Sequence, residues 1–531
     1  MRPLERLAVD ARYVIDLPGF LRHPFSLEDA RSTVERQLQA RAESFLDILE
    51  RGVYAHPRSP YYRLLSHAGV ELGDVQRHVR QDGLEATLGK LYDTGVYVTS
   101  EEMKGRQPIR RNGLEIPVST ADFDNPLGLK PHLVSTSSGS TGQGTNVQAS
   151  LKSISAASID ILLGNISQFG DRPLGFWSAG DVAKLLWYAK AGRPLATVFY
   201  SDRPRWSSFA IRQRLILLYT RFVARLLNYS IPRPEIVGRD EAPRIAKWLA
   251  EMTAGGIPAA MLCESNPAVR VCIAAKENGL DISGTLFSVG GEPYTPGKAA
   301  VLASAGASAL VSYAMTEVGG VVGRSCANAI EIDDVHFFTH RLALIQRDRE
   351  VSPGQTVGAL IYTTVHPDNL KLMLNADSGD YATMTNRECG CLMGQAGLNT
   401  HLQGVRSYQK LTSEGNTFIG SRLYELVEEV LPALFGGGIN DYQLVEEEQE
   451  SGLSKVSIVV SPRVGPIDEQ AVIAAVLENL ESSHSHAGGS TMVEMWRQGS
   501  NLQVVRREPY ATQTMKVLPL RVVSKSRGTQ A

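Results

Sequence analysis

The stretch "STSSGSTGQGT" at residues 135–145 has the residue types of a loop that binds an anion. Its three glycines permit backbone conformations that a side chain would obstruct, and successive amides in such a loop can form a nest for phosphate. The same composition is typical of a flexible linker, and the stretch lacks the lysine of a Walker loop. The residues alone therefore leave both interpretations open. Its central positions are Ser137, Ser138, Gly139, Ser140, Thr141 and Gly142.

Three of the five cysteines could form a metal site with one histidine. Cys326 and His336 lie in "SCANAIEIDDVHFF", and Cys389 and Cys391 form "CGC". Three thiolates and an imidazole suit tetrahedral zinc in a closed structural site, which leaves no open position for catalysis. The Cys-x-Cys spacing is tighter than the common Cys-x-x-Cys, and buried free thiols are the alternative.

Five further segments contain residues that suit nucleotide chemistry when they are considered together. "YAMTE" (313–317) offers an aromatic face for a purine and a carboxylate for magnesium, although each residue also has a purely structural interpretation. The others are "VGGEP" (289–293), "DSGDYA" (377–382), "GVRSYQKLTSEGN" (404–416) and "PYATQTMKVLPLR" (509–521).

In this order along the chain, these segments resemble the motifs of the adenylate-forming superfamily, which includes acyl- and aryl-CoA ligases. The stretch at 135–145 is most similar to the phosphate loop of phenylacetate-CoA ligases. The resemblance implies an enzyme that uses ATP and magnesium to activate a small carboxylic acid as an acyl-adenylate, with an aryl or arylacetic acid favoured. The acyl group would then pass to a thiol, with CoA as the co-substrate.

The resemblance also implies roles for single residues. The loop at 137–142 would hold the β- and γ-phosphates, and Tyr313 would stack on the adenine. Thr316 would contact the α-phosphate and Glu317 would hold magnesium, so both are catalytic positions. The adenine pocket would be lined by Gly291, Glu292 and Pro293.

Three residues nearer the C-terminus complete the implied site. Asp380 would accept hydrogen bonds from both ribose hydroxyls, Arg406 matches the arginine of the hinge between two domains, and Lys516 would be the catalytic lysine that reaches the carboxylate and the α-phosphate. Some phenylacetate-CoA-ligase-like members carry a structural zinc with a Cys…His…Cys-x-Cys order, so the resemblance also assigns zinc to the four cysteine and histidine positions.

The sequence departs from the family pattern in three of these motifs. Gly144 and Thr145 stand where many members have Pro and Lys, Tyr408 and Gln409 replace an acidic hinge residue, and Met515 replaces the usual glycine before the lysine. These departures keep two alternatives open. One is the same adenylation with an amine, a protein or a cofactor as acceptor, and the other is a degenerate homologue that binds nucleotide without turnover.

The elements that must position these residues indicate an α/β fold. Strand-like runs at 284–296 and 308–320 enter Gly-rich loops and enclose a helical pattern, which favours strands buried under helices. From about residue 404 the pattern changes to short strands with helices. We therefore expect a large N-terminal adenylation domain of helix-covered β-sheets over 1–404, and a small mobile α+β domain over 405–531 that carries the catalytic lysine.

The composition limits the partners of the chain. With 531 residues, 43% hydrophobic and 21% charged, it is typical of a globular protein, and a net charge of −2 gives no reason to expect nucleic acid or an anionic membrane. The arginines at 203–225 alternate with apolar residues and fit a solvated helix face. Without a signal-like start, a long apolar run or a disulfide framework, we expect a cytoplasmic protein, with a homodimer as the expected assembly.

Overall fold

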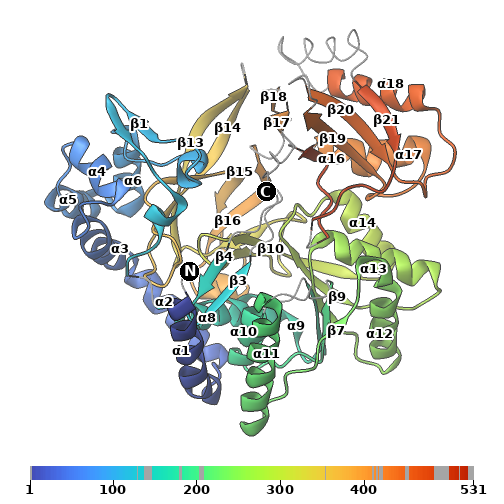
Figure 1. Cartoon of the computed structure of the whole chain (residues 1–531), viewed down its shortest axis with the longest axis horizontal. Coiled ribbons are helices and arrows are strands. Elements are labelled where there is room, and N and C mark those ends of the chain that lie inside the picture. Colours follow the sequence, from blue (N-terminus) through green and yellow to red (C-terminus); the bar gives the residue numbers. More distant parts are fainter. Residues whose placement is uncertain are drawn as a thin grey trace.

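Within the described residues, a twelve-stranded mixed sheet runs through the large domain (Figure 1). One half is parallel in the order β10-β9-β8-β5-β6-β7, and the other half, from β13 to β11, is antiparallel. The predicted α/β class is confirmed. The strands are β5 (Leu174–Ser178), β6 (Thr197–Tyr200), β7 (Glu235–Ile236), β8 (Ala260–Leu262), β9 (Leu286–Gly290), β10 (Ser308–Met315), β11 (Gly320–Arg324), β12 (Val335–Phe337), β13 (Leu342–Ser352), β14 (Gln355–Thr364), β15 (Ala376–Asn386) and β16 (Thr400–Ser407).

The computed structural model does not describe every part of the chain. The described residues are 3–127, 130–136, 146–178, 182–201, 208–352, 355–408, 412–413, 416–417, 422–448, 454–482, 502–512 and 515–523.

Alternation along the parallel strands creates two separate cores. Phe176 and Leu310 point to one face of the sheet, whereas their neighbours Trp177 and Val311 point to the other, as the two-residue period of a strand requires. The first face is covered by α8 (Leu151–Ile161), α10 (Val182–Lys190) and α11 (Ser208–Leu226), and the second by α12 (Ala242–Ala254), α13 (Ser265–Glu277) and α14 (Pro296–Ser304).

The N-terminal helices from residue 41 onward lie on the antiparallel side of the sheet. Buried residues such as Phe45, Leu65 and Leu88 pack against Ile345 and Ile361 of β13 and β14 and form a third core. This region includes α3 (Arg41–Leu49), α4 (Pro60–His67), α5 (Leu72–Asp82), α6 (Leu84–Asp93), α7 (Ser100–Met103) and the hairpin of β1 (Ile109–Arg111) and β2 (Leu114–Ile116). The first two helices, α1 (Pro3–Arg22) and α2 (Leu27–Gln39), instead pack on the core that α8, α10 and α11 cover.

The C-terminal part of the chain forms a small α+β unit with its own core, at the upper right of Figure 1. Its sheet has the order β21-β20-β19-β22. The Asp468 carboxylate accepts hydrogen bonds from the backbone N–H groups of Gln470 and Ala471 and so caps α18. The elements are α16 (Arg422–Glu425), η5 (Leu426–Val430), α17 (Leu431–Phe435), β19 (Tyr442–Glu448), β20 (Ser454–Val460), α18 (Glu469–Ser482), β21 (Leu502–Arg506) and β22 (Leu520–Val523).

None of the described helices combines the length and the apolar character that crossing a membrane requires.

Candidate functional site

Tyr313 and Asp380 meet at the junction of the parallel and antiparallel halves of the sheet. The Tyr313 hydroxyl donates a hydrogen bond to Asp380 Oδ2 at 2.7 Å and lies 3.0 Å from the hydroxyl of Tyr362. Burial, with the nearby Asp380 carboxylate, raises the pKa of Tyr313 well above its usual value. The phenol therefore stays protonated and fixes one oxygen of the Asp380 carboxylate.

Lys516 is presented by a tight turn of the small domain. The Lys516 backbone N–H donates to Thr512 Oγ1 at 3.1 Å, and the Thr512 N–H donates back to the Lys516 carbonyl at 2.9 Å. Met515 has a positive φ of 63° and is almost fully buried. A left-handed conformation costs an L-residue about 1–2 kcal/mol and suits glycine. This backbone geometry gives a physical reason for the glycine that the family pattern has at this position.

The turn places Lys516 against the loop that follows β9. Gly291 has a φ of 80°, and a Cβ at this position would lie 2.8 Å from Lys516 Nζ. Asn266 Nδ2 also donates to the carbonyl of Val517 at 3.3 Å, which ties the turn to the large domain. The lysine and the "VGGEP" segment therefore come together although 225 residues separate Gly291 from Lys516.

Glu292 is the carboxylate closest in sequence to this contact. It accepts hydrogen bonds from the Asn266 backbone N–H at 2.7 Å and from Asn266 Nδ2 at 2.8 Å. Burial raises the pKa of Glu292 to about 6, although the charges of Lys298 and Lys516 act in the opposite direction. The neighbouring Pro293 carbonyl accepts a hydrogen bond from Lys298 Nζ at 2.9 Å.

Thr316 and Glu317 lie in the turn after β10. The backbone carbonyl of Glu317 accepts a hydrogen bond from the N–H of Lys371 at 2.8 Å, which holds the turn. Within the described part of the chain, neither the Thr316 hydroxyl nor the Glu317 carboxylate has a hydrogen-bond or ion-pair partner. A half-buried carboxylate without a protein partner fits the requirements of a magnesium ligand.

Arg406 lies on β16, one strand away from Asp380. Its guanidinium pairs with the carboxylate of Asp333 at 2.9 Å, and both side chains are about nine-tenths buried. Tyr381 of β15 is the register partner of Arg406, and Asp380 is the partner of Ser407. The expected hinge arginine is thus held by the large domain.

The Ser/Gly-rich loop itself, with Ser137, Ser138, Gly139, Ser140, Thr141 and Gly142, lies outside the described residues. Its flanks are β3 (Leu133–Thr136) and β4 (Asn146–Ala149), which form an antiparallel pair with Thr136 opposite Asn146.

A buried contact between the domains was not foreseen from the sequence. Lys298 Nζ of α14 pairs with Glu428 Oε1 of η5 at 3.1 Å, and their side chains are 0% and 5% exposed. The hydroxyl of Thr295 donates to the other Glu428 oxygen. The sequence offered no signal for this pair, because 130 residues separate its charges. The contact ties the small domain to the segment that follows "VGGEP".

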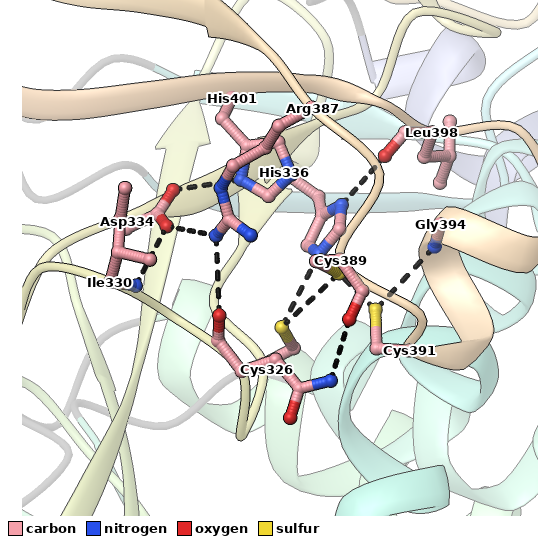
Figure 2. Close-up of polar contacts among 11 residues, drawn as sticks. Cys326, Ile330, Asp334, His336, Arg387, Cys389, Cys391, Gly394, Leu398 and His401 are labelled. Atoms are coloured by element: carbon pink, nitrogen blue, oxygen red, sulfur yellow. Dashed lines mark hydrogen bonds and ion pairs between the residues drawn. The ribbon is translucent and has the colours of Figure 1, made fainter.

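The four metal-ligand candidates converge in the large domain (Figure 2). His336 Nε2 lies 3.4 Å from the sulfur of Cys326 and 3.2 Å from those of Cys389 and Cys391, while the sulfurs of Cys326 and Cys389 are 3.8 Å apart. Zinc bonds of about 2.3 Å to sulfur and 2.0–2.1 Å to nitrogen give tetrahedral edges of about 3.5–3.8 Å. The observed separations match a closed tetrahedral site.

The surroundings of the cluster orient its ligands. The Leu398 carbonyl lies 2.6 Å from His336 Nδ1, so this nitrogen carries the proton and leaves Nε2 for a metal. Hydrogen bonds lower the pKa of Cys391 to about 3. The largest effect comes from Cys326, and His336 and the N–H of Gly394 contribute further. These hydrogen bonds favour the thiolate form of Cys391, the form that a metal requires.

A second histidine supports the ring of His336. The two ring centroids of His336 and His401 are 4.1 Å apart, and His401 Nδ1 bonds to a fully buried Asp334 at 2.8 Å. Arg387 pairs with the other Asp334 oxygen (Figure 2). The sequence interpretation missed these three residues, although Asp334 directly precedes the strand that carries His336.

No described protein family and no curated protein matches the sequence of this chain. Solved structures do match its fold. A 2-hydroxyisobutyryl-CoA ligase in a postadenylation state, in complex with an acyl-AMP, has a TM-score of 0.51 and 16% identity over 95% of this chain and 91% of its own.

Two other matches are weaker. An o-succinylbenzoate coenzyme A synthetase from Bacillus subtilis has a TM-score of 0.43 and 11% identity, with 81% of this chain and 80% of the other covered. An amide bond synthetase from Marinactinospora thermotolerans has a TM-score of 0.39 and 13% identity, with 91% and 98% covered. The chain has the fold of the adenylate-forming ligases, including their C-terminal domain.

Proposed function

We propose that this protein is an ATP-dependent ligase that converts a small carboxylic acid to an acyl-adenylate and passes the acyl group to a thiol, with CoA favoured. The observation that carries the proposal is the position of Lys516. The small domain delivers this ammonium to Gly291, beside the Tyr313–Asp380 pair of the large sheet. A cation is thus placed where charge develops during phosphoryl transfer.

In the first half-reaction, a carboxylate oxygen of the acid attacks the α-phosphorus of ATP. A new O–P bond forms, the bond from the α-phosphorus to the bridging oxygen breaks, and pyrophosphate leaves with the electron pair. Lys516 neutralises charge on the α-phosphate, Thr316 donates a hydrogen bond to it, and Asp380 orients the ribose. Magnesium, held by Glu317, would neutralise the phosphates. The chain contributes positioning and electrostatic stabilisation.

In the second half-reaction, a thiol sulfur attacks the acyl carbon. The bond from this carbon to the AMP oxygen breaks, AMP leaves, and the thiol proton passes to solvent. Lys516 must withdraw to admit the thiol, which requires the small domain to leave the contact between Lys298 and Glu428. This contact therefore belongs to the arrangement for the first half-reaction.

The Cys326–His336–Cys389–Cys391 cluster is proposed to hold a structural zinc ion. All four positions would be filled by protein, so the metal would stabilise the junction between β11, β12 and the segment after β15. Metal analysis of the purified protein tests this assignment, with one zinc per chain expected.

A second candidate keeps the adenylation and uses an acceptor other than CoA. Tyr408 stands where the family has an acidic hinge residue, and its buried hydroxyl donates to Asp377 at 2.6 Å. A residue anchored in this way is less suited to the backbone rotation that exposes an adenylate to CoA. An amine, a protein or a cofactor would then take the acyl group.

The test is pyrophosphate release with a panel of aryl, arylacetic and short aliphatic acids, with and without CoA. We expect release that depends on an acid, and thioester when CoA is present. Release without thioester would favour the second candidate. Failure of every acid to cause release, in protein that still binds ATP, would contradict both and favour a nucleotide-binding homologue without turnover.

A further inference from the structure

A buried arginine lies on the face of the sheet that α8 and α10 cover. Arg324, the last residue of β11, is only 4% exposed. Its Nη1 donates to the side-chain oxygen of Asn165 and to the hydroxyl of Ser312 at 2.9 Å. Asn165 Nδ2 in turn bonds to Ser288 Oγ and to the Tyr188 hydroxyl, both at 3.2 Å. Two neutral polar side chains thus bond to the guanidinium, and two more bond to one of them, Asn165.

This guanidinium has no carboxylate partner within the described part of the chain. Asp160, a buried acid of α8, is already engaged with His340 and Arg341 at 2.8 Å each. The buried Nε of Arg324 has no hydrogen-bond partner among the described residues. Burial of a cation with no carboxylate bonded to it is expensive, and burial lowers the pKa of Arg324, although Tyr188 and the charge of Asp160 act in the opposite direction. An anion at this position would remove the cost.

The local backbone is shaped to admit the side chain. A Cβ at Gly164 would lie 2.5 Å from Arg324 Cδ, so residue 164 has to be glycine for the arginine to pass. Gly164 and Asn165 belong to η3 (Leu162–Ile166), a π-helical turn, and such turns occur frequently at functional sites. The register of β10 and β11 also shifts at Val322, which brings Arg324 opposite Ser312 on this face.

The arginine lies close to the adenylation centre. Ser312 is the register partner of Gly290, and Gly290 is adjacent to Gly291, where Lys516 Nζ lies. A Cβ at Gly290 would approach the Ser312 carbonyl to 2.8 Å. Two consecutive glycines at the end of β9 therefore place no side chain beside Ser312, which Arg324 contacts, or beside the ammonium of Lys516.

We propose that Arg324 binds a second carboxylate of the acid substrate, so that the enzyme activates dicarboxylic acids in preference to monocarboxylic acids of the same skeleton. The proposal rests on the adenylation function proposed above. One carboxylate lies at Lys516 and becomes the acyl-adenylate, while the other replaces the missing partner of Arg324. Ser288 and Ser312 donate further hydrogen bonds to it, and a guanidinium can hold it with two parallel bonds.

The test measures pyrophosphate release as kcat/KM for matched acids, for example phenylacetate against carboxyphenylacetates and butyrate against glutarate. The wild-type enzyme is expected to favour the diacid of at least one pair by roughly 30-fold or more. This ratio corresponds to the lower end of the coupling energies of buried charge pairs. In Arg324→Met this preference is expected to be lost, because the diacid then buries an unpaired carboxylate.

Asn165→Asp is the matched variant, because it is isosteric and keeps the arginine. Its carboxylate would pair with Arg324 Nη1 inside the protein, so the preference for the diacid should fall while thermal stability rises. This second readout keeps the proposal testable if Arg324→Met does not fold. Lys276→Ala, a change of an exposed lysine, is the control for an unaltered preference.

Three outcomes separate the inference from the function on which it rests. A diacid preference that both variants reduce supports the role of Arg324. Acid-dependent pyrophosphate release with no diacid preference in any pair, or with a preference that neither variant changes, overturns it and leaves adenylation in place. Absence of release with every mono- and dicarboxylic acid, despite ATP binding, overturns the proposed function itself.

Discussion

The cysteine–histidine cluster and the proposed adenylation centre are built in opposite ways. All four cluster ligands come from one domain, and their ligand atoms lie within 4.8 Å of one another. The proposed adenylation centre combines Tyr313 and Asp380 of the large sheet with Lys516 from a turn of the small domain. The first needs contacts within one domain, whereas the second needs the contact between the two domains. Damage to the cluster should therefore reduce stability, and damage to the centre should reduce turnover.

Lys516→Ala should give the largest effect. Removal of the cation that the small domain brings to Gly291 is expected to lower adenylation by about 10³-fold, or about 4 kcal/mol of barrier. Pyrophosphate release measures this loss, while ATP binding and the melting temperature should stay close to wild type. A variant that adenylates at the wild-type rate would contradict the assignment of Lys516.

Cys391→Ser should lower stability more than turnover. Loss of one thiolate leaves an incomplete zinc site, and we expect loss of the metal with a decrease of roughly 3 kcal/mol in the free energy of unfolding. Metal analysis and denaturant unfolding check this. Cys263→Ser is the matched control, since Cys263 lies outside the cluster. Equal zinc content in both variants would mean that the cluster does not bind the metal.

Glu428→Gln tests whether docking of the domains limits the adenylation centre. The substitution leaves the fully buried Lys298 without a counter-charge, which is expected to disfavour the docked arrangement by about 2 kcal/mol. Adenylation should fall about 30-fold, and the domains should become more accessible to protease. The neighbouring Glu429→Gln changes an exposed side chain and provides the control. If both variants behave alike, the ion pair does not hold the domains.

Glu292 gives the smallest effect, through pH. Its pKa is raised by burial from 4.5 to about 6, so the folded state binds more protons than the unfolded state between these values. The contribution of Glu292 to the free energy of unfolding is therefore largest below pH 4.5 and is lost as the pH rises to about 6. Because the side chain is half-buried, we expect this loss to be roughly 1 kcal/mol. Glu292→Gln should remove this slope in denaturant unfolding at pH 4.5, 5.5 and 7. An unchanged slope would assign the dependence to another group.

Local sequence patterns predicted the local structure well. The runs at 284–296 and 308–320 form the parallel neighbours β9 and β10, and the short strands and helices expected after residue 404 include α18, which Asp468 caps. These predictions are confirmed because strand alternation and helix capping depend on residues that are close in sequence. The structure also shows that the four cysteine and histidine side chains converge, while the identity of the metal stays a prediction.

Such local patterns do not predict the contacts between distant segments. Nothing near Lys298 indicates that Glu428 will neutralise it, and nothing near Arg324 indicates that Asn165 will bond to it across 159 residues. Met515 was read only as a departure from a motif, yet its φ of 63° shows why glycine suits that position. The roles of the residues at 137–142 remain predictions, because they lie outside the described residues.

The sequence by itself determined the order of the motifs, the α/β class and the four residues able to bind a metal, since residue type and short spacing carry this information. Only the tertiary structure decided that Lys516 reaches Gly291 in this arrangement and that Arg324 is buried without an acid. Both facts depend on how separately folded elements pack. The free energy of a buried charge is set by the groups that packing places around it, and no stretch of neighbouring residues specifies them.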